Sequence, residues 1–194
     1  MNTTVNPAAS NRGSTDPAAR ELVAFWREAG PPKWFTRDDA FDAQCRARFL
    51  DLHMRASRGE LEDWLDTATG ALALVLLVDQ IPRNVFRGSA HTWATDGLAR
   101  HYAQRAIERG FDTAAGAELQ TFFYLPFVHS EALADHERAL ALYARMDGDD
   151  PGKWARHHHA IIERYGRFPH RNALLGRKST PEEHAFMDEG GFSG

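Results

Sequence analysis

The longest apolar run of the chain lies within the stretch Gly70-Ala71-Leu72-Ala73-Leu74-Val75-Leu76-Leu77-Val78-Asp79-Gln80. It presents apolar side chains on every side, which indicates a segment that is buried all round. A buried strand is the alternative, but the richness in Ala and Leu and the scarcity of β-branched residues favour a helix. The run is also far too short to cross a bilayer. We therefore predict a central buried helix over residues 70–80, with the rest of the chain packed around it.

Helical periodicity continues on both sides of this stretch, and capping and breaking residues separate the segments. Asp16 with Pro17 starts the first helix, Gly30 with Pro31 ends it, and Thr180 begins the last one. The other expected helices cover roughly residues 37–57, 60–66, 93–109, 118–125, 130–146 and 154–165. No segment shows convincing strand alternation. We expect an all-α chain, with a polar tail over residues 1–15 and a single helical domain over residues 16–194.

Composition excludes several classes of partner and site. Apolar residues make up 43% and charged residues 26% of the chain, which is the balance of a globular protein with a real core. The net charge of −4, with no Lys/Arg block, gives no electrostatic footprint for binding nucleic acid. Cys45 is the only cysteine, so no internal disulfide can form, and its apolar neighbours predict a core residue rather than a reactive thiol. Residues 1–15 lack the apolar stretch of a signal peptide, so the default expectation is a cytoplasmic protein without membrane contact.

Two segments share a pattern of proline, arginine and asparagine. Residues 79–88 read Asp-Gln-Ile-Pro-Arg-Asn-Val-Phe-Arg-Gly, and residues 166–177 read Gly-Arg-Phe-Pro-His-Arg-Asn-Ala-Leu-Leu-Gly-Arg. Each is expected to break at its proline and to present arginine and asparagine on a stiffened turn. Such groups bind carboxylate or phosphate, but they also tie one helix end to another, and both roles remain open. The candidate ligand-binding residues are Arg83, Asn84, Arg87, Arg167, Arg171 and Asn172.

Asp79 is expected at the carboxyl end of the central helix, where the helix dipole disfavours an anion. A buried carboxylate there needs a cationic partner, so a structural ion pair that ties the Pro82 turn to the core is the favoured interpretation. The two segments and their flanks carry six arginines, more than Asp79 can neutralise even if Glu131 and Asp135 absorb two. A convergent cluster would have the excess positive charge of an anion site. Scattered salt bridges are an equally weighted alternative.

A third segment, residues 125–136, reads Leu-Pro-Phe-Val-His-Ser-Glu-Ala-Leu-Ala-Asp-His. On a helix, His129 and His136 project in nearly the same direction, whereas Glu131 and Asp135 lie on a different face. The four side chains therefore cannot meet at one metal ion, and their spacing differs from that of an H-E-x-x-H site. We predict no metal site. His129 lies at or before the helix start, where its backbone can still turn the ring toward Glu131.

Two further histidines are expected in different environments. Helical phase places His158 on an inward face with Trp154 and Ile161, which favours a hydrogen-bonded core histidine over a functional one. The same argument turns Leu133 inward on the preceding helix. His170 lies between a proline and an arginine outside any helix, where side chains meet ligands more often, so it is the better functional candidate.

Together, the three segments resemble the bacterial family known as domain of unknown function 924. The resemblance covers roughly residues 20–192 and implies a helical fold near the tetratricopeptide-like folds, with antiparallel helix pairs, although no repeat of that length is visible in the sequence. It implies very little about function, because the family is uncharacterised. His136 departs from the family pattern, where Gln is expected, and is a poor site candidate for that reason. Three further matching pairs are Phe25-Trp26, Trp34-Phe35 and Phe41-Asp42.

The first functional hypothesis is a pocket for a small anionic ligand, a carboxylate or a phosphate, held by the arginines and asparagines. His129 or His170, together with Glu131, would move protons there, so the protein could be an enzyme. The alternative is a tetratricopeptide-like module whose groove receives a peptide or a partner protein, with the polar segments as helix-stapling networks. No cofactor is predicted, and the sequence defines neither the substrate, nor the reaction, nor the oligomeric state.

Overall fold

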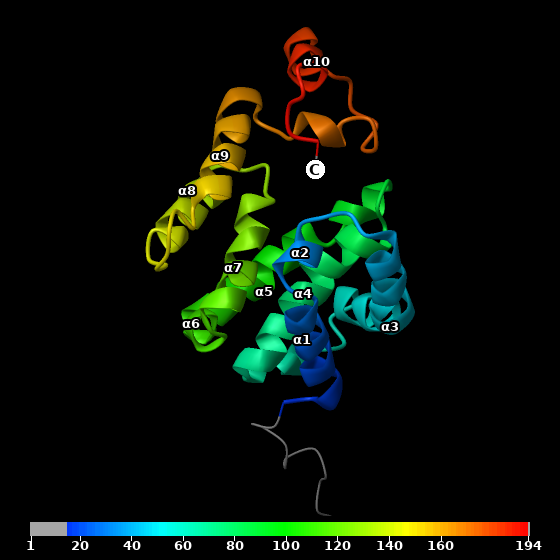
Figure 1. Ribbon diagram of the computed structural model, residues 1–194, viewed down its shortest axis with the longest axis vertical. Helices are drawn as coiled ribbons and strands as arrows, with labels where there is room; N and C mark the ends of the chain where they lie inside the picture. Colours follow the sequence, from blue (N-terminus) through cyan, green and yellow to red (C-terminus); the bar gives the residue numbers. More distant parts are fainter. Residues whose placement is uncertain (1–14, 194) are drawn as a thin grey trace, which may run out of the picture.

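One helix lies at the centre of the molecule and the others pack around it. The computed structural model describes residues 15–193, and within this part every regular element is a helix and no strand is present. In chain order the elements are α1 (Pro17–Ala29), α2 (Pro31–Trp34), α3 (Asp39–Ser57), η2 (Glu62–Asp66), α4 (Ala68–Val85), η3 (Ala90–Trp93), α5 (Asp96–Glu108), α6 (Phe111–Ala114), α7 (Ala117–Val128), α8 (Leu133–Tyr143), α9 (Lys153–Tyr165), η4 (Pro169–Arg171) and α10 (Pro181–Asp188). Figure 1 shows α4 surrounded by helices from both halves of the chain. The predicted all-α architecture around a buried central helix is confirmed.

The central helix is buried along most of its length. Every residue from Gly70 to Pro82 is buried, and the helix packs against α1, α3, α5 and α7. Its first turn is held by Thr67, whose hydroxyl accepts the backbone N–H of Gly70 at 3.1 Å. A Cβ on Gly70 would lie only 2.2 Å from the carbonyl oxygen of Trp64, so glycine permits η2 to approach the start of the helix. The strand alternative for residues 70–80 is wrong.

The central helix also continues past the proline at which we expected it to break. Pro82 lies inside α4, which ends only at Val85. Proline has no N–H, so the carbonyl of Val78 loses its usual helical partner. The hydroxyl of Thr95 donates to this carbonyl at 2.6 Å and replaces the missing hydrogen bond. A contact from seventeen residues away therefore keeps the helix intact through its proline.

Two other expected boundaries differ because of local polar contacts. The helix expected to end at Pro126 continues to Val128, and the next begins at Leu133 rather than at Ser130. The hydroxyl of Ser130 accepts the backbone N–H of Ala132 at 3.1 Å, which holds the chain in a turn between the helices. Glu131 therefore precedes α8 and is not part of a helical face. The helix expected over 93–109 begins only at Asp96, because Trp93 belongs to the separate short helix η3.

The predicted helix boundaries that carry a capping residue in the local sequence are confirmed. The carboxylate of Asp16 accepts the N–H of Ala18 at 2.7 Å at the start of α1. Gly166 adopts the left-handed conformation, with φ of 68°, where α9 ends. Thr180 and Glu183 form a complete capping box at the start of α10.

Two side chains expected to point inward are instead exposed. Leu133 is 41% exposed and Trp154 is 64% exposed. Each lies in the first turn of its helix, and helical phase alone does not define how far the neighbouring helix extends to cover that turn. His158 and Cys45 are buried as predicted, and burial raises the pKa of the Cys45 thiol to about 12.

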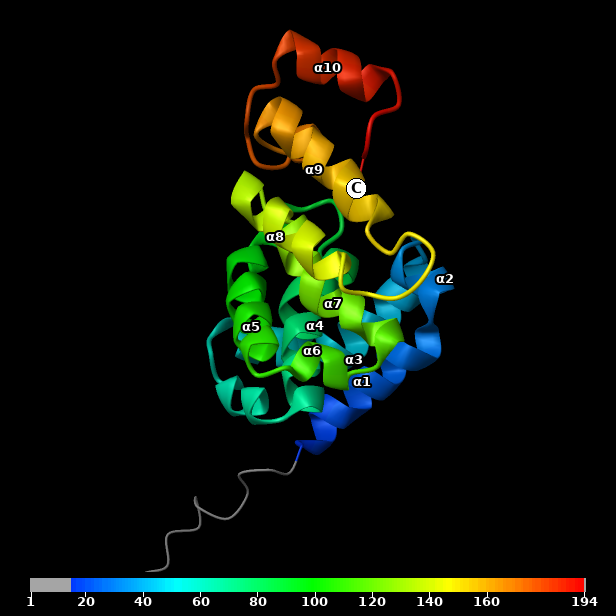
Figure 2. The ribbon, with the colours of Figure 1, turned by 90° about the vertical axis from the view of Figure 1, so that its left-hand side faces the viewer.

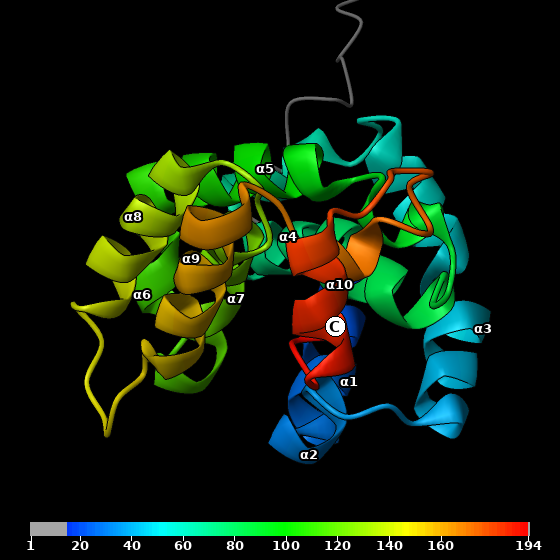
Figure 3. The same cartoon turned by 90° about the horizontal axis from the view of Figure 1, so that it is seen from above.

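The C-terminal third of the chain forms a cap with its own small apolar cluster. α8 and α9 pack on each other and on α7, and α10 lies beyond them at the end of the molecule (Figure 2). Seen from above, α10 lies beside α9 rather than directly on it (Figure 3). Ile161, Ile162 and Phe168 form the buried centre of this cluster, with Phe186 and Phe192 against it. Phe168 directly precedes η4, so the cluster fixes the segment that carries Arg171.

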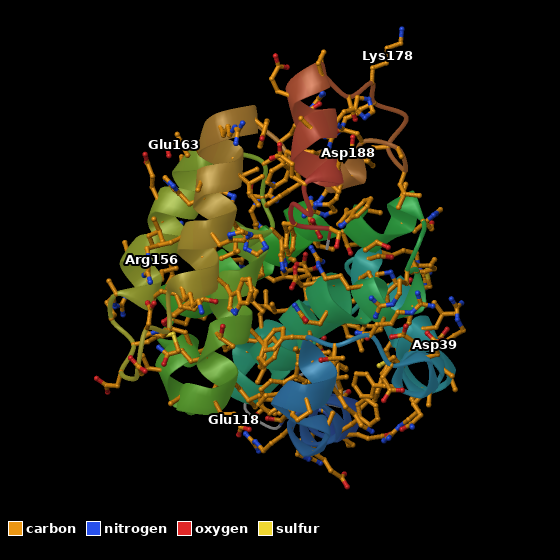
Figure 4. All side chains as sticks on the ribbon, turned by 45° about the horizontal axis from the view of Figure 1, so that its top comes forward. Asp39, Glu118, Arg156, Glu163, Lys178 and Asp188 are labelled. Atoms are coloured by element: carbon orange, nitrogen blue, oxygen red, sulfur yellow. The ribbon has the colours of Figure 1, made fainter. Side chains whose placement is uncertain are left out.

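Many charged side chains lie at the periphery. Glu163, Lys178 and Asp188 project outward from the C-terminal cap in Figure 4. Within residues 15–193, no helix has the length and apolarity needed to span a membrane. The predicted polar tail lies outside the described residues apart from Thr15, whose hydroxyl donates to that of Thr67 at 3.1 Å.

The hydrogen bond from Thr95 to the Val78 carbonyl should contribute measurably to the free energy of unfolding. We expect Thr95→Val to lower the free energy of unfolding by about 1 to 3 kcal/mol, because the buried carbonyl of Val78 loses its hydrogen-bond donor and gains no water in its place. Urea denaturation of the two proteins measures the difference. Thr113→Val is the matched control, since the Thr113 hydroxyl also donates to a carbonyl but is exposed. Equal losses in the two variants would contradict this account of how α4 passes Pro82.

Candidate functional site

A depression of about 300 Å³ lies where three distant segments of the chain meet. Its walls come from η3 and the start of α5, from the turn between α7 and α8, and from η4 with the residues after it. We call it the Arg171 pocket. It contains three of the predicted site residues, His129, Glu131 and Arg171. The charged and aromatic residues that line it are Trp93, Asp96, Arg100, His129, Glu131 and Arg171.

Behind His129 lies the carboxylate of Asp79, which is completely buried. Its Oδ1 is 2.8 Å from Nδ1 of His129, and its Oδ2 accepts the Gln80 side-chain amide at 2.5 Å. Nη1 of Arg83 lies 3.3 Å from Oδ1. Burial alone would raise the pKa of Asp79, but Arg83, His129 and the hydrogen bonds outweigh it and lower the pKa to about 2. Asp79 is therefore a buried anion, and it takes part in the ion pair expected for it.

Arg83 joins Asp79 to a second acidic residue. Its guanidinium forms a two-pronged pair with Asp96, with distances of 2.9 Å from Nη1 to Oδ1 and 3.1 Å from Nη2 to Oδ2. Nη1 also donates to the backbone carbonyl of Asp79 at 2.5 Å. Burial lowers the pKa of Arg83, but Asp79 and Asp96 together outweigh burial, so the pKa is raised above its ordinary value. The arginine thus links α4 to the first residue of α5.

His129 binds Asp79 through one ring nitrogen, and the residue lines the Arg171 pocket. Its side chain is 16% exposed. Nε2 has no hydrogen-bond partner among residues 15–193 and is not sealed from solvent. Burial lowers the pKa of His129, and Arg83 lowers it further, while Asp79 opposes both. Within the pocket the ring is therefore held neutral at physiological pH.

Arg171 is the most incompletely paired cation at the site. It is only 7% exposed, yet its two hydrogen bonds are to the His129 carbonyl at 3.0 Å and to Asp96 Oδ2 at 3.5 Å. Its Nε has no partner among the described residues. The guanidinium also lies over the rings of Phe168 and Trp93, 4.5 and 5.2 Å from their centroids. Burial lowers the pKa of Arg171 to about 10, and although Asp96 opposes this, Arg83 adds to the effect.

Glu131 lines the pocket, but both of its oxygens are engaged. Arg177 donates to Oε2 at 2.6 Å and to Oε1 at 3.0 Å, and Oε1 also accepts the backbone N–H of Phe168 at 2.9 Å. Burial raises its pKa, but Arg177 and Phe168 outweigh burial and lower it. Its predicted role as a proton carrier remains a prediction. In this arrangement the carboxylate orders the chain before and after η4.

Arg167 and Asn172 were predicted to bind a ligand, and the structure places both on Glu183 of α10. Arg167 donates to Glu183 from Nε at 2.6 Å and from Nη2 at 2.8 Å. The Asn172 amide donates to the same carboxylate at 3.1 Å and to the hydroxyl of Ser179 at 3.0 Å. These contacts tie η4 to α10, and neither side chain lines the Arg171 pocket.

Asn84 and Arg87 also lie apart from the Arg171 pocket. Because α4 continues through Pro82, Arg83 and Asn84 are successive helical residues about 100° apart and face different neighbours. The Asn84 amide donates to the carbonyl of Gln80 at 3.0 Å. Arg87 forms a two-pronged pair with Asp42, at 2.8 and 3.1 Å. Both line a separate, open depression of about 420 Å³ between α3 and the end of α4.

His170 lies in the aromatic cluster of the cap. Its ring centroid is 5.1 Å from that of Phe192, 5.6 Å from Phe168 and 6.2 Å from Trp93. Burial is the main cause that lowers its pKa to about 4, and its buried Nδ1 has no partner among the described residues. It does not line either depression. Its catalytic role stays a prediction that the pocket geometry does not support.

The remaining histidines of interest are core residues. His136 is fully buried, with Nε2 2.7 Å from the Ser130 carbonyl oxygen, and His158 has Nδ1 2.7 Å from the Trp154 carbonyl oxygen. Burial lowers the pKa of both rings, that of His158 to about 3. Among residues 15–193, no group of three or more His, Cys, Asp or Glu side chains is arranged to hold a metal ion.

Comparisons with known proteins now place the chain in a family. The family model described as "Bacterial protein of unknown function (DUF924)" matches residues 22–191. The chain belongs to this family. A solved structure of a protein of unknown function from Agrobacterium tumefaciens is similar to it, with 50% sequence identity, a TM-score of 0.86, and coverage of 89% of this chain and 97% of that one. No curated protein matches the chain.

Three residues of this member of the DUF924 family line the pocket without having been singled out from the sequence. Asp96 was not singled out because an acidic residue in the first turn of a helix is common there for helix stability alone. Arg100 lies one turn later and pairs with Asp135 at 3.2 Å. Trp93, in η3, carried no sequence signal because a single tryptophan is as readily a core residue as a pocket wall.

The contacts of Glu183 predict a specific loss of stability in acid. In the folded protein Arg167 lowers the pKa of Glu183 to about 2, whereas the unfolded chain has the ordinary value near 4.5. The contribution is therefore complete above about pH 4.5 and is lost as the pH falls toward 2. We expect Glu183→Gln to remove about 1 to 2 kcal/mol of unfolding free energy at pH 7, allowing for screening at the partly exposed Arg167, and little at pH 2.5.

Denaturation of the wild type and Glu183→Gln at pH 7, 4.5 and 2.5 measures this difference. The matched control is Glu182→Gln, because Glu182 is exposed on the same helix and has no ion pair within residues 15–193. Parallel stability curves for the wild type and Glu183→Gln would show that the network around Arg167 and Asn172 does not hold the cap.

Proposed function

We propose that the Arg171 pocket binds a small anionic ligand, a carboxylate or a phosphate. The observation that carries the proposal is the incomplete pairing of Arg171. A guanidinium has five N–H donors, and Arg171 uses two of them within the described part of the protein. An anion in the pocket would supply the missing acceptors and would offset the burial of the positive charge.

The other arginines near the pocket contrast with Arg171. Arg83 and Arg177 each pair through two nitrogens with one carboxylate, and Arg100 lies 3.2 Å from Asp135. Each of these charges is thus balanced by its own acidic partner. Arg171 shares Asp96 with Arg83 and receives the longer contact. It is the guanidinium with the most to gain from an incoming anion.

The size and walls of the pocket suit a small ligand. A volume of about 300 Å³ is at the lower end of the range for small-molecule sites. Trp93, Ala94 and Leu175 supply apolar wall, while Ser130 and His129 supply polar groups that could orient the ligand. Because the other charged side chains around the pocket are paired with one another, we expect a compact anion that contacts Arg171 directly.

Titration with inorganic phosphate and with succinate, at constant ionic strength in a chloride buffer, tests the proposal. We expect either ligand to raise the melting temperature of the wild type, and Arg171→Gln to weaken binding at least tenfold, or by about 1.4 kcal/mol. Arg171→Lys should lose part of this affinity, since an ammonium keeps the charge but not the fork.

Arg87→Gln is the matched control, because Arg87 carries the same charge and pairs with Asp42 away from the pocket. It should bind both ligands as the wild type does. Equal weakening in Arg87→Gln and Arg171→Gln would assign any binding to general electrostatics. No binding of either ligand by the wild type would remove the small-anion proposal and favour the tetratricopeptide-like interaction module instead.

A further inference from the structure

A completely buried carboxylate and a histidine at a pocket wall form one hydrogen-bonded pair. Oδ1 of Asp79 lies 2.8 Å from Nδ1 of His129, and the two residues come from α4 and from the turn after α7. His129 lines the Arg171 pocket, and its opposite ring nitrogen, Nε2, has no hydrogen-bond partner among residues 15–193, so Nε2 is the nitrogen left for a ligand in the pocket. From the sequence alone, Asp79 is expected in a structural ion pair and His129 is expected to turn toward Glu131. The structure pairs His129 with Asp79 instead.

This pairing defines which nitrogen carries the proton in the neutral ring. An ionised carboxylate accepts hydrogen bonds and cannot donate them, so Nδ1 of His129 must be the N–H that faces Asp79. Nε2 then carries a free lone pair on the pocket side. A histidine with one nitrogen oriented by a carboxylate and the other presented to a ligand has the arrangement of a general base.

Both members of the pair are held in place by further contacts. Gln80 donates to the second oxygen of Asp79 at 2.5 Å, and Arg83 lies 3.3 Å from the first. The backbone of His129 is fixed on both sides: its N–H donates to the Leu125 carbonyl at 2.9 Å, and its own carbonyl accepts from Arg171 at 3.0 Å. The guanidinium proposed to bind the ligand therefore also positions the histidine.

The charges around the pair suit a ring that is neutral at rest and becomes protonated during a reaction. Arg83 from α4 disfavours the imidazolium, while Asp79 and Asp96 favour it. His136 of α8 and His158 of α9 lie within electrostatic range and are held neutral by burial. When the ring gains a proton, the adjacent charge of Asp79 stabilises the product without itself taking the proton.

We propose that Asp79 and His129 act as a general-base pair that removes a proton from the anionic ligand bound at Arg171. This inference rests on the proposed function. Nε2 of His129 takes the proton, and the electron pair of the broken bond stays on the ligand atom. The new negative charge on the ligand faces the Arg171 guanidinium, and Asp79 keeps its charge opposite the imidazolium. The substrate class is a small carboxylate or phosphate that carries an acidic hydrogen.

The state of His129 can be tested without knowledge of the substrate. Long-range ¹H–¹⁵N spectra of the full chain between pH 5 and 8 report which ring nitrogen is protonated. We expect Nδ1 of His129 to be protonated and Nε2 to be unprotonated at pH 7. A proton on Nε2 would overturn the proposal, because that nitrogen could not then act as a base.

Reactivity toward diethyl pyrocarbonate, read at each histidine by mass spectrometry, tests the same nitrogen chemically. The modification rate of a short histidine-containing reference peptide should fall about eightfold between pH 7.0 and 5.5, because the ordinary pKa of histidine is near 6.5. The modification rate of His129 should fall clearly less, since burial lowers the pKa of its ring. Asp79→Asn should reduce the rate at His129, and Gln80→Leu is a second variant that weakens the same clamp and leaves the ion pair with Arg83.

Anion protection separates the two proposals. Inorganic phosphate should slow modification of His129 at least fivefold and leave His184 unchanged. If His129 reacts as expected but phosphate neither binds nor protects, the ligand site is wrong and the base pair stands. If phosphate binds at Arg171 but His129 is inert or follows the pH dependence of the reference peptide, the general-base proposal is wrong and the ligand site stands.

Discussion

The buried charge of Asp79 is the constraint on which the arrangement of the site depends. Its carboxylate lies in the central helix, with no exposure to water, and an ion there must find compensation within the protein. Arg83 supplies it from the next turn of α4 and draws in Asp96 of α5. His129 donates a hydrogen bond to the same carboxylate from the turn between α7 and α8. One buried charge thus brings three separate parts of the fold together.

The charges alternate outward from this point. Asp79 is followed by Arg83, Arg83 by Asp96, and Asp96 by Arg171, which carries the segment after α9 into the same cluster. Each inner member is satisfied by its neighbours, whereas the outermost member, Arg171, is left with more donors than acceptors. The network therefore stabilises the packing of the C-terminal cap and, at its edge, leaves a cation without full compensation beside a pocket.

The fold was largely predictable because its determining signals are local. The Ala and Leu content of residues 70–80 favours a buried helix over a strand, and residues such as Asp16 and Thr180 satisfy helix ends within two or three positions. The continuation of α4 past Pro82 was not predictable, because it depends on Thr95, which belongs to a different element. From sequence alone, a proline predicts a break in a helix, because the pattern does not show whether a distant donor replaces the lost hydrogen bond.

The site was predictable in composition but not in grouping. His129 and Arg171 reach one pocket, whereas Arg87, Arg167 and His170 belong to three other environments. Neighbouring positions in a motif diverge on a helix, and an arginine that ties two helices together has the same sequence signature as one that binds a ligand. What distinguishes them is the balance of donors and acceptors after folding. A guanidinium whose donors are all paired has none left for an anion, and only the three-dimensional structure shows which arginine is incompletely paired.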